Sequence, residues 1–459
     1  MPSPNRKRRR VHVNPDHTRR SHVPAPSDAE IEHRLTTLVQ PAVYAELDYY
    51  RHLGYRNRLL GLPVMVALVL ALIWRRIPGV CTLQRMLARE RILWTEPTTV
   101  SQPALSERFL SFPAVLFERV LYRVLSRLPD RQAARTRPLP SHLVALRSRF
   151  HACYAVDGTT LEALFRKLQT LRERPDAPLA GHLGVAVDLI SHLPSKLWWA
   201  DEAATNDKAL APSIVDWLER DSLLVFDLGY FAFWLFDALS AASAWFVTRM
   251  RDKVSYRVQR VLVNREHVRD QIIQLGLYKG NGQCQQLMRL VEVYVNGRWQ
   301  RYLTNVLDPQ RLNVVEVVAL YDARWSIETT FLLVKRLLDL AYLWVGSLNG
   351  VKVQVFATFL FYAILIDLCD DVADQLGLAL EQISVEMVYR GLYHYVTAVN
   401  QQLFSGDAPT YLAREATGLG IIKRQRVRDG PSVTEQIRRA LVAPPLPDAN
   451  LTDCEGTNL

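Results

Sequence analysis

One stretch of the sequence decides the fold: NVVEVVALYDARWSIETTFLLVKRLLDL, from Asn313 to Leu340. It contains neither Pro nor Gly, and its apolar residues recur at steps of three and four, which is the pattern of a helix. Asn313 is a suitable N-cap, and Glu316, three residues later, completes a capping-box pair. The stretch therefore predicts one long helix.

Four polar side chains of this helix share one stripe of its surface, within about 60° of one another on a helical wheel. They are Tyr321, Arg324, Glu328 and Lys335. Such a stripe could hold a divalent cation at the carboxylate, with phosphates lying along the cations. It also fits a solvated helix face on which Arg324 and Glu328 pair at i,i+4. Helical periodicity does not separate these two interpretations.

The spacing of the four residues is more specific than their periodicity. The string Tyr321-x2-Arg324-x3-Glu328-x6-Lys335 resembles the Y-x2-R-x3-E-x6-K signature of the DDE transposases of bacterial insertion sequences, in the insertion-sequence-four-like group. Four fixed residue types at fixed distances are a far stronger signal than a single acidic residue.

Two earlier acidic motifs follow in the order of that family. Asp157 lies in YAVDGTTLE and Asp227 in LLVFDLGYF, each after an apolar run where a strand is expected to end. The family commonly has Asp-Arg-Gly-Tyr/Phe at the middle motif, and Leu228 replaces the Arg here. The resemblance covers roughly residues 143 to 370. It implies that Asp157, Asp227 and Glu328 bind two Mg²⁺ ions, for which Mn²⁺ can substitute, on a ribonuclease-H-like fold.

The chemistry of three such acids supports a metal site. Carboxylates brought together repel one another unless cations balance them, and hard oxygen ligands select Mg²⁺ or Mn²⁺. Two ions about 3.5–4 Å apart can activate a water or a 3′-hydroxyl and stabilise the leaving oxygen of a phosphoryl transfer. Arg324 and Lys335 would then clamp flanking phosphates, and Tyr321 would hydrogen-bond a phosphate. Any one acid alone would more simply be a surface or capping carboxylate.

Composition limits the class of protein. The 459 residues suffice for two or three domains, and the formal net charge of +10 favours a polyanionic partner. Five cysteines without a C-x2-C pair argue against a zinc site and a disulfide framework. The basic N-terminus has no apolar segment behind it, so no secretory signal is expected. The most apolar run, Leu59 to Trp74, falls short of the ~20 residues of a membrane span, and we expect a buried helix and no membrane.

The predicted fold class is α/β, with a ribonuclease-H-like catalytic core interrupted by a β-rich insertion and preceded by an all-α N-terminal domain. The expected parts are a disordered basic arm (1–28), a helical DNA-binding domain (29–130), a linker (131–142), the first part of the core (143–250), the insertion (251–310), the second part of the core with the signature helix (311–375), and a C-terminal helical region with a basic tail (376–459). The basic tail, like the arm, is interpreted either as a DNA contact or as a solvated segment.

Within the N-terminal domain, the segment from Val100 to Leu121 predicts a helix capped by Ser101, a break at Pro113 and a second helix. Arg108, Arg119 and Arg123 would then be available for DNA. An ordinary helical hairpin explains the same pattern equally well.

The insertion carries the strongest turn signal, Asn296-Gly297, between two β-like runs. Trp299 beside this turn could stack on a base displaced from distorted DNA, or simply pack on the sheet. Three histidines near the acidic motifs, His151, His182 and His192, lack the spacing of metal ligands, so core or surface positions are expected for them.

Taken together, these features predict a cut-and-paste DNA transposase of the bacterial cytoplasm, associated with the nucleoid. It would bind the terminal inverted repeats of its element as a homodimer in a synaptic complex. Mg²⁺-dependent cleavage, through a hairpin intermediate as the resemblance implies, would precede joining of the 3′-hydroxyls to target DNA. Two other classes stay open: a catalytically silent transposase-derived DNA-binding protein, and a metal-dependent nuclease without strand transfer. A polytopic membrane protein is a third, less favoured interpretation.

Overall fold

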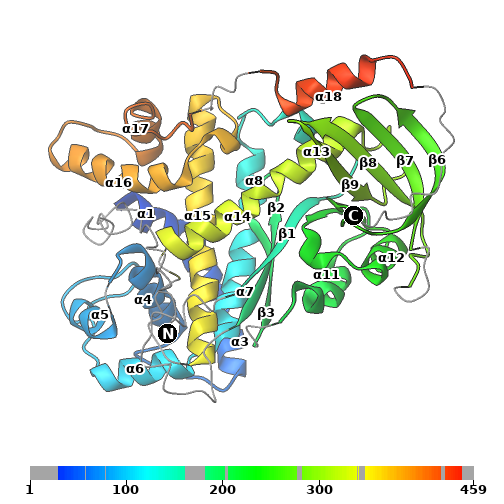
Figure 1. Ribbon diagram of the computed structural model, residues 1–459. Helices are drawn as coiled ribbons and strands as arrows, with labels where there is room; N and C mark the ends of the chain where they lie inside the picture. Colours follow the sequence, from blue (N-terminus) through cyan, green and yellow to red (C-terminus); the bar gives the residue numbers. More distant parts are fainter. Residues whose placement is uncertain are drawn as a thin grey trace, which may run out of the picture.

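A large mixed sheet and a group of helices around one long helix form the two lobes of the protein (Figure 1). The computed structural model describes residues 29–56, 58–77, 79–160, 181–201, 205–276, 282–338, 340, 347–424 and 430–446. The predicted basic arm and two arginines of the predicted basic tail, Arg426 and Arg428, lie outside the described residues.

The sheet has nine strands in the order β3-β2-β1-β4-β5-β9-β8-β7-β6. Their bounds are β1 Cys153–Thr160, β2 His182–Asp188, β3 Pro194–Ala200, β4 Leu223–Phe226, β5 Trp245–Arg249, β6 Tyr256–Asn264, β7 Val268–Leu275, β8 Met288–Val295 and β9 Arg298–Thr304. Strands β1, β4 and β5 are parallel, and the other pairs are antiparallel. All four side chains of β4 are buried, as expected for a central parallel strand covered on both faces. The α/β class with a mixed sheet is therefore confirmed.

Strands β6 to β9 form an antiparallel extension that joins the rest of the sheet through the pairing of β9 with β5. The turn between β8 and β9 is formed by Asn296 and Gly297, which both have positive φ, 51° and 76°. These angles are those of a type I′ turn, whose twist matches that of the flanking strands. The predicted hairpin is confirmed.

Helices precede the sheet, cover it and follow it. Before β1 lie α1 Ala29–Arg34, the π-helix η3 Leu35–Val39, α2 Gln40–Ala45, α3 Leu47–His52, α4 Leu62–Trp74, α5 Val80–Leu87, α6 Gln102–Ser111, α7 Ala114–Leu125, α8 Leu128–Ala133 and α9 Ser141–Arg147. Between strands lie η5 Asp207–Leu210, α11 Ala211–Trp217, η6 Leu228–Tyr230 and α12 Phe233–Ala241. After β9 come α13 Val314–Ala323, α14 Trp325–Leu332, η7 Leu333–Leu337, α15 Leu348–Leu376, η8 Leu380–Gln382, α16 Val385–Asn400, α17 Ala408–Arg414 and α18 Val433–Val442.

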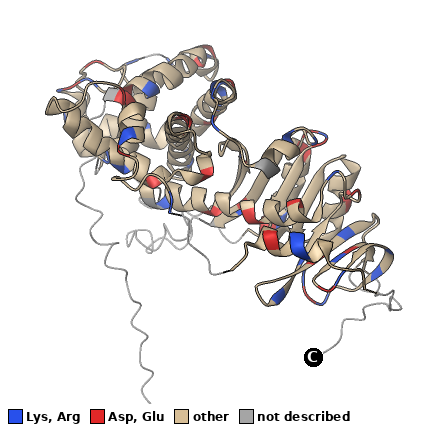
Figure 2. Cartoon of the chain, turned by 90° about the horizontal axis from the view of Figure 1, so that it is seen from above, with Lys and Arg blue, Asp and Glu red and all other residues tan. Residues whose placement is uncertain are grey.

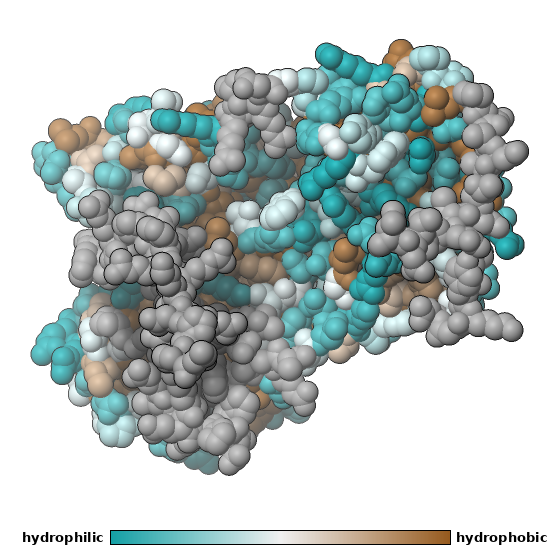
Figure 3. Space-filling model, viewed as in Figure 1, coloured by the Kyte–Doolittle hydropathy of each residue, from teal (hydrophilic) through white to brown (hydrophobic). Residues whose placement is uncertain are grey.

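The long helix α15 is the centre of the helical lobe and packs against α4, α7 and α17 (Figure 1). By length and composition it is the one helix in the described ranges that could cross a membrane, but 94% of its apolar window is buried inside the protein. Helix α15 is therefore a core helix of the protein. Helix α4 is also buried almost throughout. On the outside, basic and acidic residues are interspersed over both lobes (Figure 2), and the face over the sheet seen in Figure 3 is mainly hydrophilic.

The predicted helix–break–helix of the N-terminal region is confirmed: the Ser101 side chain accepts from the Ala104 N–H, and α6 ends before Pro113. The arginines of this segment also have partners within the protein, and their availability for DNA stays a prediction. Arg108 donates to the Tyr50 hydroxyl (2.7 Å) and to a backbone carbonyl.

Arg119 and Arg123 bind one carboxylate, that of Glu46, at 2.5 Å each. Glu46 is only 1% exposed, and a buried carboxylate is stable only when it is paired. The two arginines therefore hold α7 against the turn between α2 and α3.

The signature stretch is not one long helix, which corrects the prediction. Its start is as predicted, since the Asn313 side chain accepts from the Glu316 N–H (3.0 Å) and Glu316 accepts from the Asn313 N–H (2.9 Å). Helix α13 then ends at Ala323, Arg324 lies between the two helices, and α14, which begins at Trp325, continues into the π-helical turn η7. A π turn holds more residues than an α turn. The angular position of Lys335 around the helix therefore differs from the one that about 100° per residue would give.

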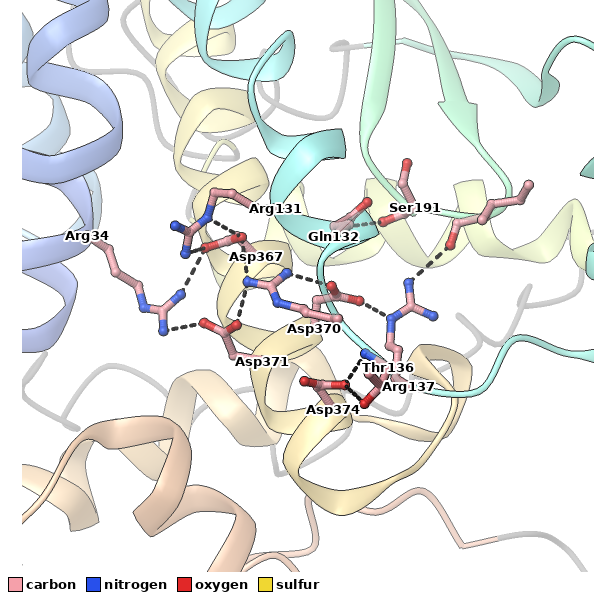
Figure 4. Close-up of polar contacts among 12 residues, drawn as sticks. Arg34, Arg131, Gln132, Thr136, Arg137, Ser191, Asp367, Asp370, Asp371 and Asp374 are labelled. Carbon is pink, nitrogen blue, oxygen red and sulfur yellow. Dashed lines mark hydrogen bonds and ion pairs between the residues drawn. The ribbon is translucent and has the colours of Figure 1, made fainter.

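The segment predicted as a linker is tied to α15. Arg137, which follows α8, binds Asp370 (Figure 4). Arg135 binds both Asp370 and Asp367. These contacts anchor the chain between the helical lobe and the start of the sheet. The domain boundaries themselves stay a prediction.

Candidate active site

Two of the three predicted acids lie side by side at the centre of the sheet. Strands β1 and β4 are parallel, and their last paired residues are Val156 and Phe226. Asp157 and Asp227 are the next residues of the two strands. Strand β4 ends there, whereas β1 continues to Thr160 because Asp157 and the residues after it pair with β2. The expectation that β1 ends at Asp157 is therefore wrong, although its parallel pairing does end there.

Backbone N–H groups fix one oxygen of each aspartate. The Gly158 N–H donates to Oδ1 of Asp157, and the Gly229 N–H donates to Oδ1 of Asp227, both at 2.8 Å. The second contact is also the N-cap of the short helix η6. Each carboxylate therefore has a set orientation and keeps a second oxygen for another partner.

The third acid, Glu328, reaches the same place through Arg324. Helix α14 packs against β1. One guanidinium nitrogen of Arg324 lies 2.9 Å from Oε1 of Glu328, and another lies 3.4 Å from Oδ2 of Asp157. The Arg324 side chain is only 8% exposed. The structure thus brings Asp157 and Glu328 together on one guanidinium, with Asp227 beside Asp157. Among the residues that it describes, no three His, Cys, Asp or Glu side chains are close enough to share an ion as they stand.

The electrostatics of the pair fit a cation site. Burial and the neighbouring charge of Asp227 raise the pKa of Asp157 to about 6, although the Gly158 N–H and Arg324 act in the opposite direction. A carboxylate whose pKa is raised by another carboxylate lacks compensating positive charge. Hard oxygen donors with excess negative charge are the ligands that Mg²⁺ takes. Asp157 and Asp227 therefore fit such an ion, and Glu328 would join them once Arg324 moves aside.

The other residues of the signature line the same region. Lys335 donates from Nζ to the Thr159 hydroxyl of β1, and burial lowers the pKa of Lys335 while the charge of Asp157 raises it. Tyr321 is 7% exposed, and its ring lies 5.5 Å from the Arg324 guanidinium and 5.3 Å from that of Arg249. Burial raises the pKa of the Tyr321 phenol, so it stays a hydrogen-bond donor.

Trp299 and Leu228 are both partly exposed, at 37% and 36%. The Trp299 ring contacts the Tyr294 ring and lies 4.7 Å from the Arg269 guanidinium, so its role in base stacking stays a prediction. At the position where the resembled family has Arg, Leu228 accepts from Arg251 through its backbone carbonyl (3.4 Å).

Sequence reasoning missed one acid at this site, Asp207 of η5. Its Oδ1 lies 2.8 Å from Nε2 of His182, which is a buried residue of β2. The other two histidines have carboxylate partners elsewhere, His151 with Glu219 and His192 with Glu381. Asp207 belongs to no motif. The available signal in the sequence was a glycine close behind each aspartate, Gly158 and Gly229, because a larger side chain there would collide with the Asp207 carboxylate.

Replacing Asp157 by Asn is expected to stabilise the metal-free protein by about 3 kcal/mol near neutral pH, since each pKa unit corresponds to 1.36 kcal/mol. The folded carboxyl, with its pKa of about 6 against an ordinary 3.8, binds its proton more tightly than the unfolded one. Wild-type stability therefore falls as pH rises between these two values, whereas Asn does not titrate.

Urea unfolding of the wild type and of Asp157→Asn in the presence of a chelator measures this difference in stability. The gain should be full above a pH of about 6 and should vanish below about 4. A gain that is the same at both pH values would contradict the electrostatic explanation.

Residues 149–364 match the protein family described as "Transposase DDE domain". The matched segment contains the whole sheet, α13, α14 and the three acids, so this part of the chain is similar to a transposase DDE domain.

Two relatives are transposases. The chain is 28% identical over 172 residues to "Putative transposase y4zB" of Sinorhizobium fredii (strain NBRC 101917 / NGR234), which covers 36% of this chain and 47% of the relative. It is 26% identical over 285 residues to "Probable transposase for insertion sequence element IS5377" of Geobacillus stearothermophilus, which covers 61% of this chain and 70% of the relative. The chain thus spans about half the length of the first relative.

A solved structure, described as a piggyBac transposase synaptic complex with hairpin DNA, aligns with 88% of this chain and 85% of its own, at 12% identity and a TM-score of 0.36.

Proposed function

We propose that this protein is the transposase of a bacterial insertion sequence of the insertion-sequence-four-like group and moves its element by cutting and pasting DNA. The observation that carries the proposal is the position of Asp157 and Asp227 at adjacent strand ends, with Glu328 linked to Asp157 through Arg324, inside a DDE domain. The strand order β3-β2-β1-β4-β5 with an antiparallel β2 supports a ribonuclease-H-like core. Strands β6 to β9 then correspond to the β-rich insertion between the second and third acids.

The three acids would hold two Mg²⁺ ions, which when bound supply an activated water or 3′-hydroxyl and stabilise the leaving oxygen. Asp157 and Asp227 would present their other oxygens to the ions in fixed directions, because backbone N–H groups already hold one oxygen of each. Lys335 acts as a point charge for a phosphate, and Tyr321 donates a hydrogen bond to one.

Arg324 has a further part in this proposal. Its guanidinium bridges Glu328 and Asp157 and partly compensates their charge. A phosphate is the other partner that a guanidinium binds bidentately. Binding of the DNA backbone would draw Arg324 from the carboxylates, so that Glu328 becomes free to bind an ion only when substrate is present.

The test uses the purified full chain, a duplex that carries the terminal inverted repeats flanking the reading frame, Mg²⁺ and a supercoiled target plasmid. Nicks at the element ends, hairpin ends on denaturing gels and joined products in the plasmid are the expected results. Retention of DNA without metal-dependent nicking would indicate a silent DNA-binding protein instead. Nicking without joined products would indicate a nuclease. The mass of the protein–DNA complex tests the proposed homodimer.

Lys335→Ala is expected to weaken binding of end DNA and to lower the slope of log affinity against log salt by about one, which is the loss of one phosphate contact. Mobility shifts over a series of salt concentrations measure this slope. Arg390, a partly exposed residue of α16 that pairs with Glu386, provides the control, and Arg390→Ala should leave the slope unchanged. An unchanged slope for Lys335→Ala would remove Lys335 from the phosphate-binding residues.

A further inference from the structure

Asp207 lies in the space between the two catalytic-motif glycines. A Cβ placed on Gly158 would lie 1.9 Å from Oδ1 of Asp207, and a Cβ placed on Gly229 would lie 2.6 Å from Oδ2. Both distances are far below van der Waals contact. The glycine after Asp157 and the glycine two residues after Asp227 therefore leave the room that the Asp207 carboxylate occupies.

Among the residues that the structure describes, His182 alone holds the Asp207 carboxylate. Its Oδ1 lies 2.8 Å from Nε2 of His182, whose side chain is 5% exposed. Its Oδ2 faces the backbone of Gly229. It also lies on the side of Asp227, because Oδ1 of Asp227 would lie 2.8 Å from the same Cβ placed on Gly229. One oxygen is thus bound to a histidine, and the other is directed toward the acid pair.

A buried hydroxyl in the same place has room for a further partner. Tyr230, three residues after Asp227, is 1% exposed, and within the described part of the chain its hydroxyl has no hydrogen-bond partner. The charges of Asp207, Asp157 and Asp227 all raise the pKa of this phenol, after burial itself, so the hydroxyl is near all three carboxylates. Buried polar groups rarely stay unsatisfied. The unsatisfied hydroxyl of Tyr230 is therefore open to a further ligand at this place.

We propose that Asp207 is a fourth acid of the cation site, with Oδ1 oriented by His182 and Oδ2 drawn into the shell of an ion that Asp157 and Asp227 hold. As the described side chains stand, no three of them are close enough to share an ion, so the three carboxylates would close around it on binding. The proposal rests on the function proposed above, in which those two aspartates bind a divalent cation. His182 is a positioning residue here. A histidine that fixes one oxygen of a carboxylate ligand sets the direction of the other, and such outer contacts affect metal affinity by about 10–100-fold.

The test is calorimetric titration of the full chain with Mn²⁺ in the absence of DNA, which reads binding rather than activity. Asp207→Asn should lower the Mn²⁺ affinity by at least about 10-fold, and His182→Gln should lower it in the same direction and by less. Asp216→Asn, which changes an exposed acid of the neighbouring helix α11, should leave the affinity unchanged. Circular dichroism melting shows whether each variant is folded, and His182→Gln carries the test if Asp207→Asn does not fold.

Wild-type affinity in Asp207→Asn and His182→Gln, together with weakened binding in Asp157→Asn, would overturn the role of Asp207 and leave the proposed function intact. Absence of Mn²⁺ binding by the wild-type chain would overturn both proposals. The two failures are therefore distinguishable.

Discussion

Replacing Glu328 by Gln is expected to slow Mg²⁺-dependent cleavage of element ends by about 10³-fold while DNA binding is retained. A carboxylate that helps to hold the ions contributes several kcal/mol to stabilisation of the charge that develops in phosphoryl transfer, and each 1.36 kcal/mol is a factor of ten in rate. Gln keeps the shape of Glu and can still accept from Arg324, so helix α14 should remain in place. The loss therefore isolates the charge of the third acid.

Single-turnover cleavage rates with saturating protein measure the effect, and mobility shifts check binding. Asp157→Asn and Asp227→Asn should lose a similar factor, because all three acids serve the same ions. The exposed Asp216 is again the matched control, and Asp216→Asn should cleave at the wild-type rate. Rates within about twofold of wild type for all three acid variants would show that the chemistry lies elsewhere.

The acid pair could be predicted from the sequence because its determinants are local. Asp157 and Asp227 each follow a run of buried β-forming residues, and parallel strands present their ends at one edge of a sheet. The Asn313–Glu316 capping box and the Asn296-Gly297 turn are likewise set by residues a few positions apart, so their geometry follows from local chemistry.

The contacts that the sequence did not reveal join residues far apart in the chain. Glu46 binds Arg119 and Arg123, which lie 73 and 77 positions away, and nothing near these arginines in sequence shows that their charge is already paired. Asp207 follows Asp157 by 50 positions and belongs to no motif. Its position becomes apparent only when β1, β4 and η5 are placed together. The contact between the Arg324 guanidinium and Asp157 of β1 likewise joins residues 167 positions apart.

The acidic end of α15 is the clearest case of a pattern whose meaning depends on tertiary structure. Asp367 and Asp370 follow an apolar run and look like the solvated end of a helix, yet both side chains are fully buried. Three arginines surround Asp367 (Figure 4): Arg34 at 2.9 Å, Arg135 at 2.8 Å, and Arg131 through two nitrogens at 3.1 Å each. The cluster joins α1, α8 and the segment after α8 to α15.

Asp367→Asn is expected to lower the free energy of unfolding by about 3–5 kcal/mol, which is the cost of removing one partner of a buried ion pair and leaving the others uncompensated. The effect should be large because Asp367 has no access to solvent and Arg135 is only 7% exposed. The guanidinium groups of Arg34 and Arg135, 9% and 7% exposed, cannot recover full hydration when the cluster is broken. Urea unfolding of the full chain measures the difference.

The control is Glu386→Gln, which removes an i,i+4 ion pair with Arg390 on the partly exposed face of α16 and should cost only about 0.3–0.5 kcal/mol. The pH dependence separates charge from packing. The arginines hold the pKa of Asp367 below its ordinary value of 3.8, so its contribution is complete above that value and is lost as pH falls through the lowered pKa. The difference between wild type and Asp367→Asn should therefore be constant near neutral pH and shrink in acid. A difference that persists unchanged in acid would mean that Asn disturbs packing around α15 and that the charge of Asp367 is not what stabilises the helical lobe.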